Sequence, residues 1–395
     1  MHLKKPVIGI EAQRLFRAKK HGMDYVALEI IQQLQYLDLE NEYIIFVADG
    51  PDSDCLQETA NFKIVVLSNP FGFIAWEQFT LPKAAKEYGC DLLHCTSNTA
   101  PLFCAVPVVT TVHDIIYLEN NYLWNTEASV YQRLGNFYRK LLVPMVLKRS
   151  AHITTVSNTE RDLMTTRFPE ISNKISVVYN GVSNFFTAYD ILANNYKEHW
   201  LPKNYVLFNA STDSRKNTIR VLQAYATAIQ HFKENPPKLV LLNMSEKRLK
   251  VLLKKCDIEA VYTNVFCKPY VTRETLREVY DRARCFLFPS LREGFGLPIL
   301  EAFALKTPVI TAAISCLPEV AGYKNGYFVN PYSVEAIAAT LVSVCTANEL
   351  GYDLDAAKAH AMQFSWESSA KKTLEVYGKV LTAVSSKNQK MYQNA

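Results

Sequence analysis

The stretch from Cys285 to Ala304 constrains the fold of this 395-residue chain more than any other. It opens with a short apolar run, Cys285–Phe288, which is typical of a buried parallel strand, and a loop with two glycines follows. Pro298 then fits the first turn of a helix, where its missing N–H costs nothing. The pattern predicts a helix N-terminus at the carboxyl edge of the strand. In open α/β sheets ligands bind at that edge, and the helix dipole favours an anion there, typically a phosphate.

Two carboxylates flank this predicted anion site. Glu293 precedes the glycines, and Glu301 is expected in the first turn of the helix, with seven residues between them. A carboxylate does not bind phosphate oxygens, but it accepts hydrogen bonds from sugar hydroxyls, and a nucleotide sugar has a sugar on each side of its diphosphate. The pair is consistent with a nucleotide-sugar site. The alternative is that both glutamates only complement the helix dipole.

The segment Phe288-Pro-Ser-Leu-Arg-Glu-Gly-Phe-Gly-Leu-Pro-Ile-Leu-Glu301 resembles the donor-site motif of retaining glycosyltransferases of the GT-B architecture. The match continues through Thr307–Ile310 and Leu317–Gly322, whereas Leu305-Lys306 stands where the family usually has Cys-Gly. The resemblance implies a group 1 glycosyltransferase, similar to family 4 and of the mannosyltransferase type. It implies that Glu301 holds the nucleotide ribose and Glu293 the transferred sugar. The diphosphate would lie on the backbone N–H groups of Gly294, Phe295, Gly296 and Leu297.

Composition limits the class of protein. A chain of this length predicts two domains, and 49% apolar residues argue against disorder. A net charge of +5 is too small to indicate nucleic acid binding by itself. The nine cysteines form no CxxC pair, so buried reduced thiols are expected rather than zinc ligands or disulfides. Neither a signal peptide nor a membrane-spanning run is recognisable, which predicts a cytoplasmic protein, soluble or peripheral at the inner face of a membrane.

Strand-like and helix-like runs alternate along the chain, which predicts α/β domains with parallel sheets. We expect two Rossmann-like, doubly wound domains that face a central cleft. The first would span residues 1–185 and carry the acceptor, and a linker would span 186–203. Residues 204–364 would form the nucleotide-sugar domain, and the resemblance implies that 365–395 form a last helix that crosses back to the first domain.

In the first domain, two features are candidates for function. His113 follows the strand-like run that ends at Val112, and Thr110-Thr-Val-His-Asp114 resembles the family's histidine motif, which implies that His113 contacts the donor sugar. The loop Glu11–His21 is basic where the family is glycine-rich, so it is either a solvated loop or a site for a negatively charged acceptor. Its candidate acceptor-side residues are Arg14, Arg17, His21 and Gly22.

In the second domain, Arg215-Lys216 lies at a strand-to-helix turn, where cations suit a phosphate. The pair resembles the family's Arg-Lys-Asn motif, which implies that both residues bind the diphosphate and that Lys216 is the firmer ligand. Val271, in the turn before a predicted helix, would lie against the nucleobase. No metal or other cofactor is expected, because the two basic groups could neutralise the diphosphate in place of a metal.

Residues 126–149 form a predicted helix in which the apolar run Leu141–Leu147 is flanked by basic pairs. It is either a packed helix with its charged ends in solvent or a peripheral membrane face.

Together these features predict a retaining, metal-independent hexosyltransferase that uses a nucleotide sugar and a glycan or lipid-linked acceptor. We expect a role in bacterial cell-surface polysaccharide or glycolipid synthesis, and no nucleic acid partner. His113, Lys216 and Glu293 are the expected catalytic residues. The alternatives are a nucleotide-sugar epimerase or phosphorylase, and a catalytically silent nucleotide-sugar-binding subunit of the same fold.

Overall fold

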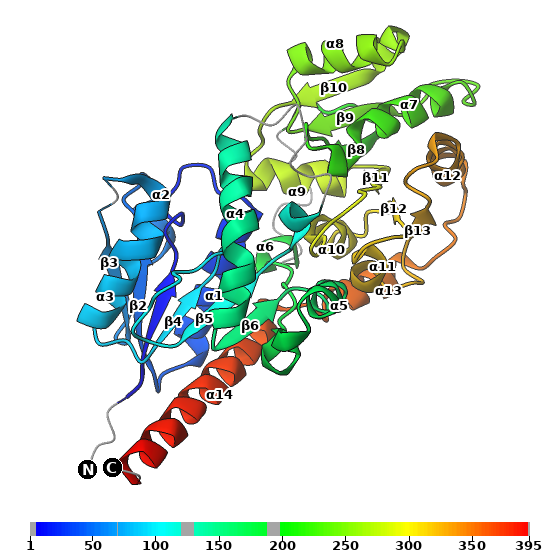
Figure 1. Cartoon of the computed structure of the whole chain (residues 1–395). Coiled ribbons are helices and arrows are strands. Elements are labelled where there is room, and N and C mark those ends of the chain that lie inside the picture. Colours follow the sequence, from blue (N-terminus) through cyan, green and yellow to red (C-terminus); the bar gives the residue numbers. More distant parts are fainter. Residues whose placement is uncertain (1–4, 69, 120–129, 188–197, 394–395) are drawn as a thin grey trace. The chain divides into compact units, whose positions relative to one another are not determined.

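The computed structural model describes residues 5–68, 70–119, 130–187 and 198–393 (Figure 1). The chain divides into two compact units. Unit 1 comprises the described parts of 1–123, 130–181 and 365–395, and unit 2 comprises those of 182–364. Most of the predicted linker lies outside the described residues.

Unit 1 is built on a seven-stranded sheet whose strands are all parallel, in the order β3-β2-β1-β4-β5-β6-β7. The order reverses between β1 and β4, which is the topological switch point of a doubly wound sheet. The strands are β1 Val7–Glu11, β2 Glu42–Val47, β3 Phe62–Val66, β4 Leu92–Cys95, β5 Val108–Val112, β6 His152–Thr155 and β7 Ile175–Val177.

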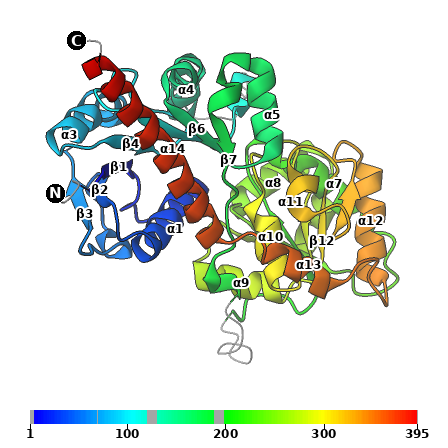
Figure 2. The same ribbon diagram turned by 90° about the horizontal axis from the view of Figure 1, so that it is seen from below.

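The helices of unit 1 follow the predicted alternation. The α-helices are α1 Gly22–Leu37, α2 Gly72–Ala75, α3 Leu81–Glu87, α4 Val130–Arg149, α5 Asn158–Arg167 and α14 Trp366–Gln393. A π-helical turn, Trp76–Thr80, joins α2 to α3, and short 3₁₀ turns span Ser53–Cys55, Ile116–Leu118 and Pro169–Lys174. The last helix, α14, packs on α1 and β4 (Figure 2, red). Tyr377 of α14 is buried, and its hydroxyl lies 2.7 Å from Nδ1 of His94 in β4.

Unit 2 repeats this architecture with a six-stranded parallel sheet in the order β10-β9-β8-β11-β12-β13. Its order reverses between β8 and β11. The strands are β8 Tyr205–Asn209, β9 Lys238–Leu242, β10 Val265–Lys268, β11 Cys285–Phe288, β12 Val309–Ala312 and β13 Tyr327–Val329. The α-helices are α6 Asn184–Thr187, α7 Thr218–Ile229, α8 Glu246–Lys255, α9 Arg273–Asp281, α10 Leu297–Ala304, α11 Leu317–Ala321, α12 Val334–Thr346 and α13 Leu354–Ala361. Short 3₁₀ turns span Ser214–Lys216 and Glu259–Asn264.

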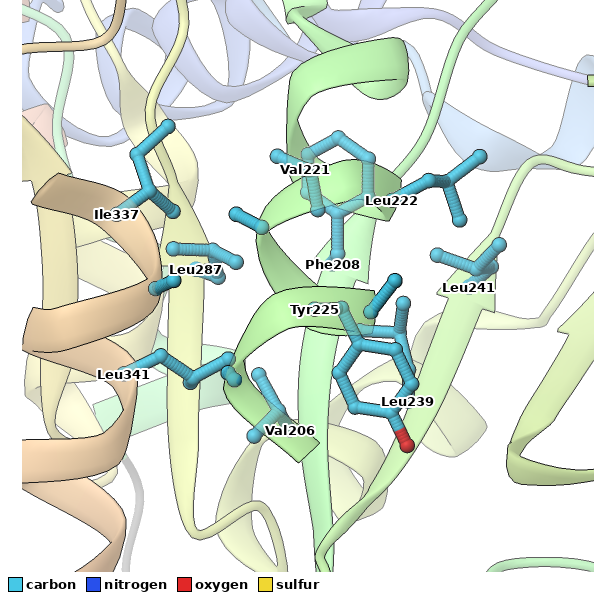
Figure 3. Close-up of a cluster of buried hydrophobic side chains, with 14 of the residues drawn as sticks. Val206, Phe208, Val221, Leu222, Tyr225, Leu239, Leu241, Leu287, Ile337 and Leu341 are labelled. Atoms are coloured by element: carbon cyan, nitrogen blue, oxygen red, sulfur yellow. The ribbon is translucent and has the colours of Figure 1, made fainter. Parts of the chain in front are cut away.

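The core of unit 2 explains why the sequences of its strands are continuous apolar runs. β8, β9 and β11 are central strands covered on both faces, so nearly every side chain in them is buried. One face packs against α7 and α12, where Leu222, Tyr225 and Leu341 are fully buried (Figure 3). This packing fixes the carboxyl ends of β8 and β11, from which the candidate site is built.

Candidate functional site

The glycine turn predicted from the sequence connects β11 to α10. Gly296 is the N-cap of α10 and has φ +112°, a conformation that side-chain-bearing residues rarely adopt. A Cβ at this position would also lie 3.0 Å from Leu317 Cδ2. Pro298 is in the first turn of the helix, as predicted. The positive end of the α10 dipole therefore lies beside the loop that carries Glu293.

The structure brings Lys216 and Glu293 together at this edge of the sheet. Lys216 lies in the 3₁₀ turn after β8 and Glu293 in the loop after β11, and their Nζ and Oε1 atoms are 2.6 Å apart. The lysine Nζ also lies 5.2 Å from the centre of the Phe288 ring. The Lys216 side chain is 28% exposed and the Glu293 side chain is 12% exposed, so Lys216 is the more accessible member of the pair.

Arg215 makes a bidentate ion pair with Asp213 in the same turn. Its Nη2 lies 2.7 Å from Asp213 Oδ2, and its Nε lies 3.1 Å from Oδ1. The backbone of this turn is hydrogen-bonded to the loop after β11, because the Arg215 carbonyl accepts a hydrogen bond from the Leu291 N–H at 2.7 Å.

Asn217 locks the basic turn in place, a role that the sequence analysis did not assign. It adopts a left-handed conformation with φ +63° and is buried. Its side-chain amide donates to the carbonyls of Pro289 and Pro331, at 3.0 and 2.7 Å. These two prolines follow β11 and β13, so one side chain joins the basic turn to both loops. The only feature of the sequence that pointed to Asn217 was its place in the Arg-Lys-Asn motif.

The backbone of Glu293 is held by a second group that sequence reasoning missed. The Ser315 hydroxyl donates to the Glu293 carbonyl at 2.9 Å and lies 3.2 Å from the Glu293 N–H. Cys316 Sγ lies 3.2 Å from the same carbonyl, and Arg292 Nη1 lies 2.7 Å from it. Ser315 has φ +61°, so a strained backbone position carries the contacts.

Glu301 is the fifth residue of α10, which places it in the second turn. The expectation that it lies in the first turn was wrong, because the helix begins only at Leu297, directly after the glycine N-cap. Glu301 is half-buried, and the Tyr280 hydroxyl of α9 is the first of the groups that act on its carboxyl. Burial raises the pKa of Glu301 to about 7, and the Tyr280 contact and Arg273 oppose this shift.

The remaining donor-side candidates lie around this cluster. Phe295 is buried against Phe364, with ring centres 5.9 Å apart, so only its backbone remains for a ligand. Gly294 and Leu297 lie beside it in the glycine turn. Val271 precedes Thr272, the N-cap of α9, as the sequence analysis placed it.

His113 lies in unit 1, directly after β5. Its Nε2 is 2.9 Å from the Thr96 carbonyl oxygen, and its backbone N–H donates to Asn98 Oδ1 at 2.6 Å. Because a carbonyl cannot donate, Nε2 carries the hydrogen in this contact. Burial lowers the pKa of His113, so the ring is neutral at neutral pH and Nδ1 keeps its lone pair. Nδ1 can therefore accept a hydrogen bond from a hydroxyl group.

The basic loop of unit 1 makes ion pairs with residues of the same unit. Arg14 Nε lies 3.6 Å from Asp24 Oδ1, and Lys20 pairs with Asp52. The His21 N–H donates to Asp24 Oδ2 at 2.9 Å, at the start of α1, and α1 begins at Gly22. Arg17 is exposed. The charge available to an acceptor is thus smaller than the sequence suggests, and the acceptor role of this loop stays a prediction.

Two Asp-x-Asp triplets occur in the chain, and neither lies at the candidate site. Asp52 belongs to the pair with Lys20, while Asp353 caps α13 and Asp355 lies 2.5 Å from Lys306 Nζ. Within the described residues, no group of three or more histidine, cysteine, aspartate or glutamate side chains is placed to hold a metal ion. Metal independence stays a prediction that rests on Lys216 and Arg215.

Two family models match the chain, largely one on each unit. Residues 21–184 match the model described as Glycosyltransferase Family 4, and residues 194–359 match the model described as Glycosyl transferases group 1.

Curated relatives carry mannosyltransferase names. The chain is 26% identical to the serotype-specific mannosyltransferase WbdA of Escherichia coli over 279 residues, which are 69% of this chain and 33% of WbdA. It is 28% identical to the O-antigen chain mannosyltransferase RfbU of Salmonella typhimurium over 249 residues, 62% of each chain. The chain thus spans about a third of the length of the first of these relatives.

Solved structures share the fold. Sucrose-phosphate synthase from Thermosynechococcus elongatus superposes with a TM-score of 0.70 at 18% identity, over 96% of this chain and 100% of that one. WaaG, a glycosyltransferase involved in lipopolysaccharide biosynthesis, superposes with a TM-score of 0.68 at 16% identity, over 93% and 99%. These likenesses confirm the predicted GT-B fold with two Rossmann-like domains. Both models describe glycosyltransferases, and together they cover residues 21–184 and 194–359, so the chain belongs to the glycosyltransferases.

Proposed function

We propose that this chain transfers a hexosyl unit from a nucleotide-diphosphate sugar to an acceptor hydroxyl, with retention of the anomeric configuration. The observation that carries the proposal is the Lys216–Glu293 pair, 2.6 Å apart beside the N-terminus of α10. One member can neutralise a diphosphate, and the other can accept hydrogen bonds from a sugar. The names of the curated relatives favour a mannosyl unit.

In the proposed reaction the bond between the anomeric carbon and the diphosphate oxygen breaks, and a bond from that carbon to the acceptor oxygen forms on the same face. The acceptor proton passes to the leaving diphosphate. Negative charge grows on the diphosphate, and Lys216, Arg215 and the N–H groups at the start of α10 would stabilise it.

The donor would replace the ion pair seen in the structure. As Lys216 turns to the diphosphate, the Glu293 carboxylate is released to the hydroxyls of the transferred sugar. Glu301 would accept hydrogen bonds from the ribose hydroxyls. His113 would accept a hydrogen bond from a hydroxyl of the donor sugar through Nδ1.

We propose that the acceptor is a glycan or a lipid-linked sugar of bacterial cell-surface polysaccharide or glycolipid, reached by a protein at the inner face of a membrane. The O-antigen names of the curated relatives support this choice.

A panel of nucleotide sugars, screened by thermal shift, tests the donor site first, because a ligand of the folded state raises its melting temperature. The donor that binds is then incubated with acceptor, and free nucleoside diphosphate is measured. Release only in the presence of acceptor is expected of a transferase, whereas an epimerase or a silent binding subunit would give none. Proton NMR of the product should show the donor's anomeric configuration, and turnover should persist with excess chelator. An inverted product would contradict the proposal.

A further inference from the structure

Helix α4 of unit 1 presents an apolar stripe to solvent. Residues at intervals of three and four positions lie on one side of a helix, and the exposed ones here are Leu134, Phe137, Leu141 and Met145. The opposite side is buried in the unit, through Leu142, Val143, Val146 and Leu147. The apolar run Leu141–Leu147 therefore divides between core and surface: the packed-helix interpretation accounts for its buried side chains, and the membrane-face interpretation of its exposed ones stays a prediction.

A second group of exposed apolar side chains lies beside α4. Its members are Phe71, Ile74 and Phe79, around α2 and the π-helical turn, and Phe79 is 74% exposed. Contacts below the surface show that the two groups are neighbours. The rings of Phe73 and Tyr138 of α4 are 6.1 Å apart, and Gln78 donates to the Tyr138 hydroxyl at 2.9 Å.

Phe103 extends the same surface at the other end of α4. Its side chain is 74% exposed, and the guanidinium of Arg149 lies 4.5 Å from the centre of its ring. Arg149 also donates to the Leu102 carbonyl at 2.8 Å. We call the exposed residues of the three groups the apolar surface of unit 1. They are Phe71, Ile74, Phe79, Phe103, Leu134, Phe137, Leu141 and Met145.

The charged residues of α4 itself are all basic. The sequence of α4, Val130–Arg149, contains no aspartate or glutamate and five basic residues, which are Arg133, Arg139, Lys140, Lys148 and Arg149. Lys148 is paired with Glu170 at 3.2 Å, and Arg139 donates to Asn136 on the same helix. The buried carboxyl of Glu77 does not reach this surface.

We propose that the apolar surface of unit 1 docks on an anionic lipid bilayer. Large exposed aromatics suit the interface between headgroups and acyl chains, and basic side chains beside them suit anionic headgroups. Within the described residues, no helix is long and apolar enough to cross a bilayer, so the contact is peripheral. The inference goes beyond the proposed function, because it assigns a surface that takes no part in the transfer chemistry.

The charge argues for lipid rather than for a second copy of the chain. Two copies that met through α4 would bring two sets of basic residues together with no acidic partner on either helix. An anionic bilayer supplies the missing charge. Binding should then weaken with salt, because the attraction is screened within about a Debye length, about 8 Å at physiological ionic strength.

Vesicle flotation of the full chain tests the proposal. Vesicles of phosphatidylcholine are compared with vesicles that also contain phosphatidylglycerol, for the wild type and for a triple variant with Ile74→Ser, Phe79→Ser and Phe137→Ser. The wild type should float only with the anionic vesicles, and the variant should bind at least about tenfold more weakly. A matched control carries Tyr36→Ser and Leu39→Ser, which are apolar residues of unit 1 outside the surface with exposures of 82% and 70%, and should bind like the wild type.

Three outcomes would overturn the proposal. They are equal binding by the wild type and the triple variant, equal binding to neutral and anionic vesicles, and a lipid-free dimer that the triple variant dissociates in light scattering. The last would assign the surface to a second copy. Thermal shift with the nucleoside diphosphate keeps the test separate from the proposed function, because the triple variant should retain wild-type nucleotide binding whether or not it binds lipid.

Discussion

At the scale of single residues, the candidate site is defined by opposite charges that already have partners. Lys216 pairs with Glu293, and Arg215 pairs with Asp213. The side chains of both pairs are between 12% and 28% exposed. Their value is geometric, since each fixes a long side chain at the carboxyl edge of the sheet before a ligand arrives. A diphosphate would take the place of a protein carboxylate as the partner of the cation.

The two glutamates of the motif are expected to affect different kinetic constants. The ribose changes little during reaction, whereas the transferred sugar gains positive charge, so only a contact to the sugar grows in the transition state. Glu301→Gln should weaken binding of the free nucleoside diphosphate and raise the donor KM, with a smaller effect on kcat. Glu293→Gln should not weaken nucleotide binding, because it removes the carboxylate that competes for Lys216, and should lower kcat by about 10²-fold, which corresponds to about 2.7 kcal/mol.

Calorimetry with the bare nucleotide and steady-state kinetics with the full donor measure these effects. Glu335→Gln serves as the control, because Glu335 is a glutamate near the start of another helix of unit 2, α12, and should change neither constant. An equal loss of nucleotide affinity in both active-site variants would show that the pair is one structural unit at the start of α10.

Ser315 is expected to position Glu293 through its hydroxyl, which contacts both the carbonyl and the N–H of that residue. Ser315→Gly removes these hydrogen bonds and relieves the left-handed backbone, whereas Ser315→Ala removes them and keeps the strain. Both should lower kcat by roughly tenfold at unchanged nucleotide affinity, the cost of about one hydrogen bond. If the serine were only structural, both variants would lower the melting temperature and leave kcat at the wild-type value.

At the scale of elements, the sequence predicted the backbone of the site better than its side-chain contacts. Cys285–Phe288 is a strand and Pro298 lies in the first turn of a helix, because apolar runs and proline act locally. The contacts of Lys216 with Glu293 and of Ser315 with Glu293 join loops that follow different strands. Such contacts depend on strand order, which no local pattern contains.

The π-helical turn Trp76–Thr80 contains a buried acid whose titration should be visible in stability. Glu77 accepts from the Tyr138 hydroxyl at 2.6 Å and from Gln78 at 2.9 Å, and contacts Thr99. Burial nevertheless raises its pKa to about 7. The fold thus favours the neutral carboxyl, so its contribution to stability is full below the ordinary pKa of 4.5 and is lost as pH rises through 7.

Glu77→Gln should remove this pH dependence, because the amide keeps the shape of the side chain without its ionisation. The difference in unfolding free energy between wild type and variant should change by roughly 3 kcal/mol between about pH 4.5 and pH 8, with the wild type losing stability as pH rises. Melting temperatures across this range measure it, and Glu87→Gln, at the exposed end of α3, is the control. Parallel curves of melting temperature against pH for the wild type and Glu77→Gln would contradict the raised pKa of Glu77.

At the scale of the whole molecule, both units are doubly wound parallel sheets, and each has candidate site residues after the carboxyl ends of its strands. His113 follows β5 of unit 1, while Lys216, Glu293 and Glu301 belong to unit 2. The chain enters unit 2 after Gly181 and returns to unit 1 at Ser365. All of the proposed nucleotide ligands are therefore in unit 2, and unit 1 contributes the imidazole alone to the proposed donor chemistry.

This division predicts that His113 affects turnover without affecting the affinity for the nucleoside diphosphate. Because Nε2 is held by the Thr96 carbonyl, only Nδ1 remains to accept a sugar hydroxyl, and a bare nucleoside diphosphate has no transferred sugar. His113→Ala should lower kcat on the order of 10²-fold and leave calorimetric affinity for the nucleoside diphosphate unchanged. His152→Gln is the matched control, since His152 is a partly buried histidine of the same unit that contacts Ser176 and lies in β6. If His113→Ala also weakened the bare nucleotide, the imidazole would act on the nucleotide as well, and the proposed separation of sugar and nucleotide contacts between the two units would be wrong.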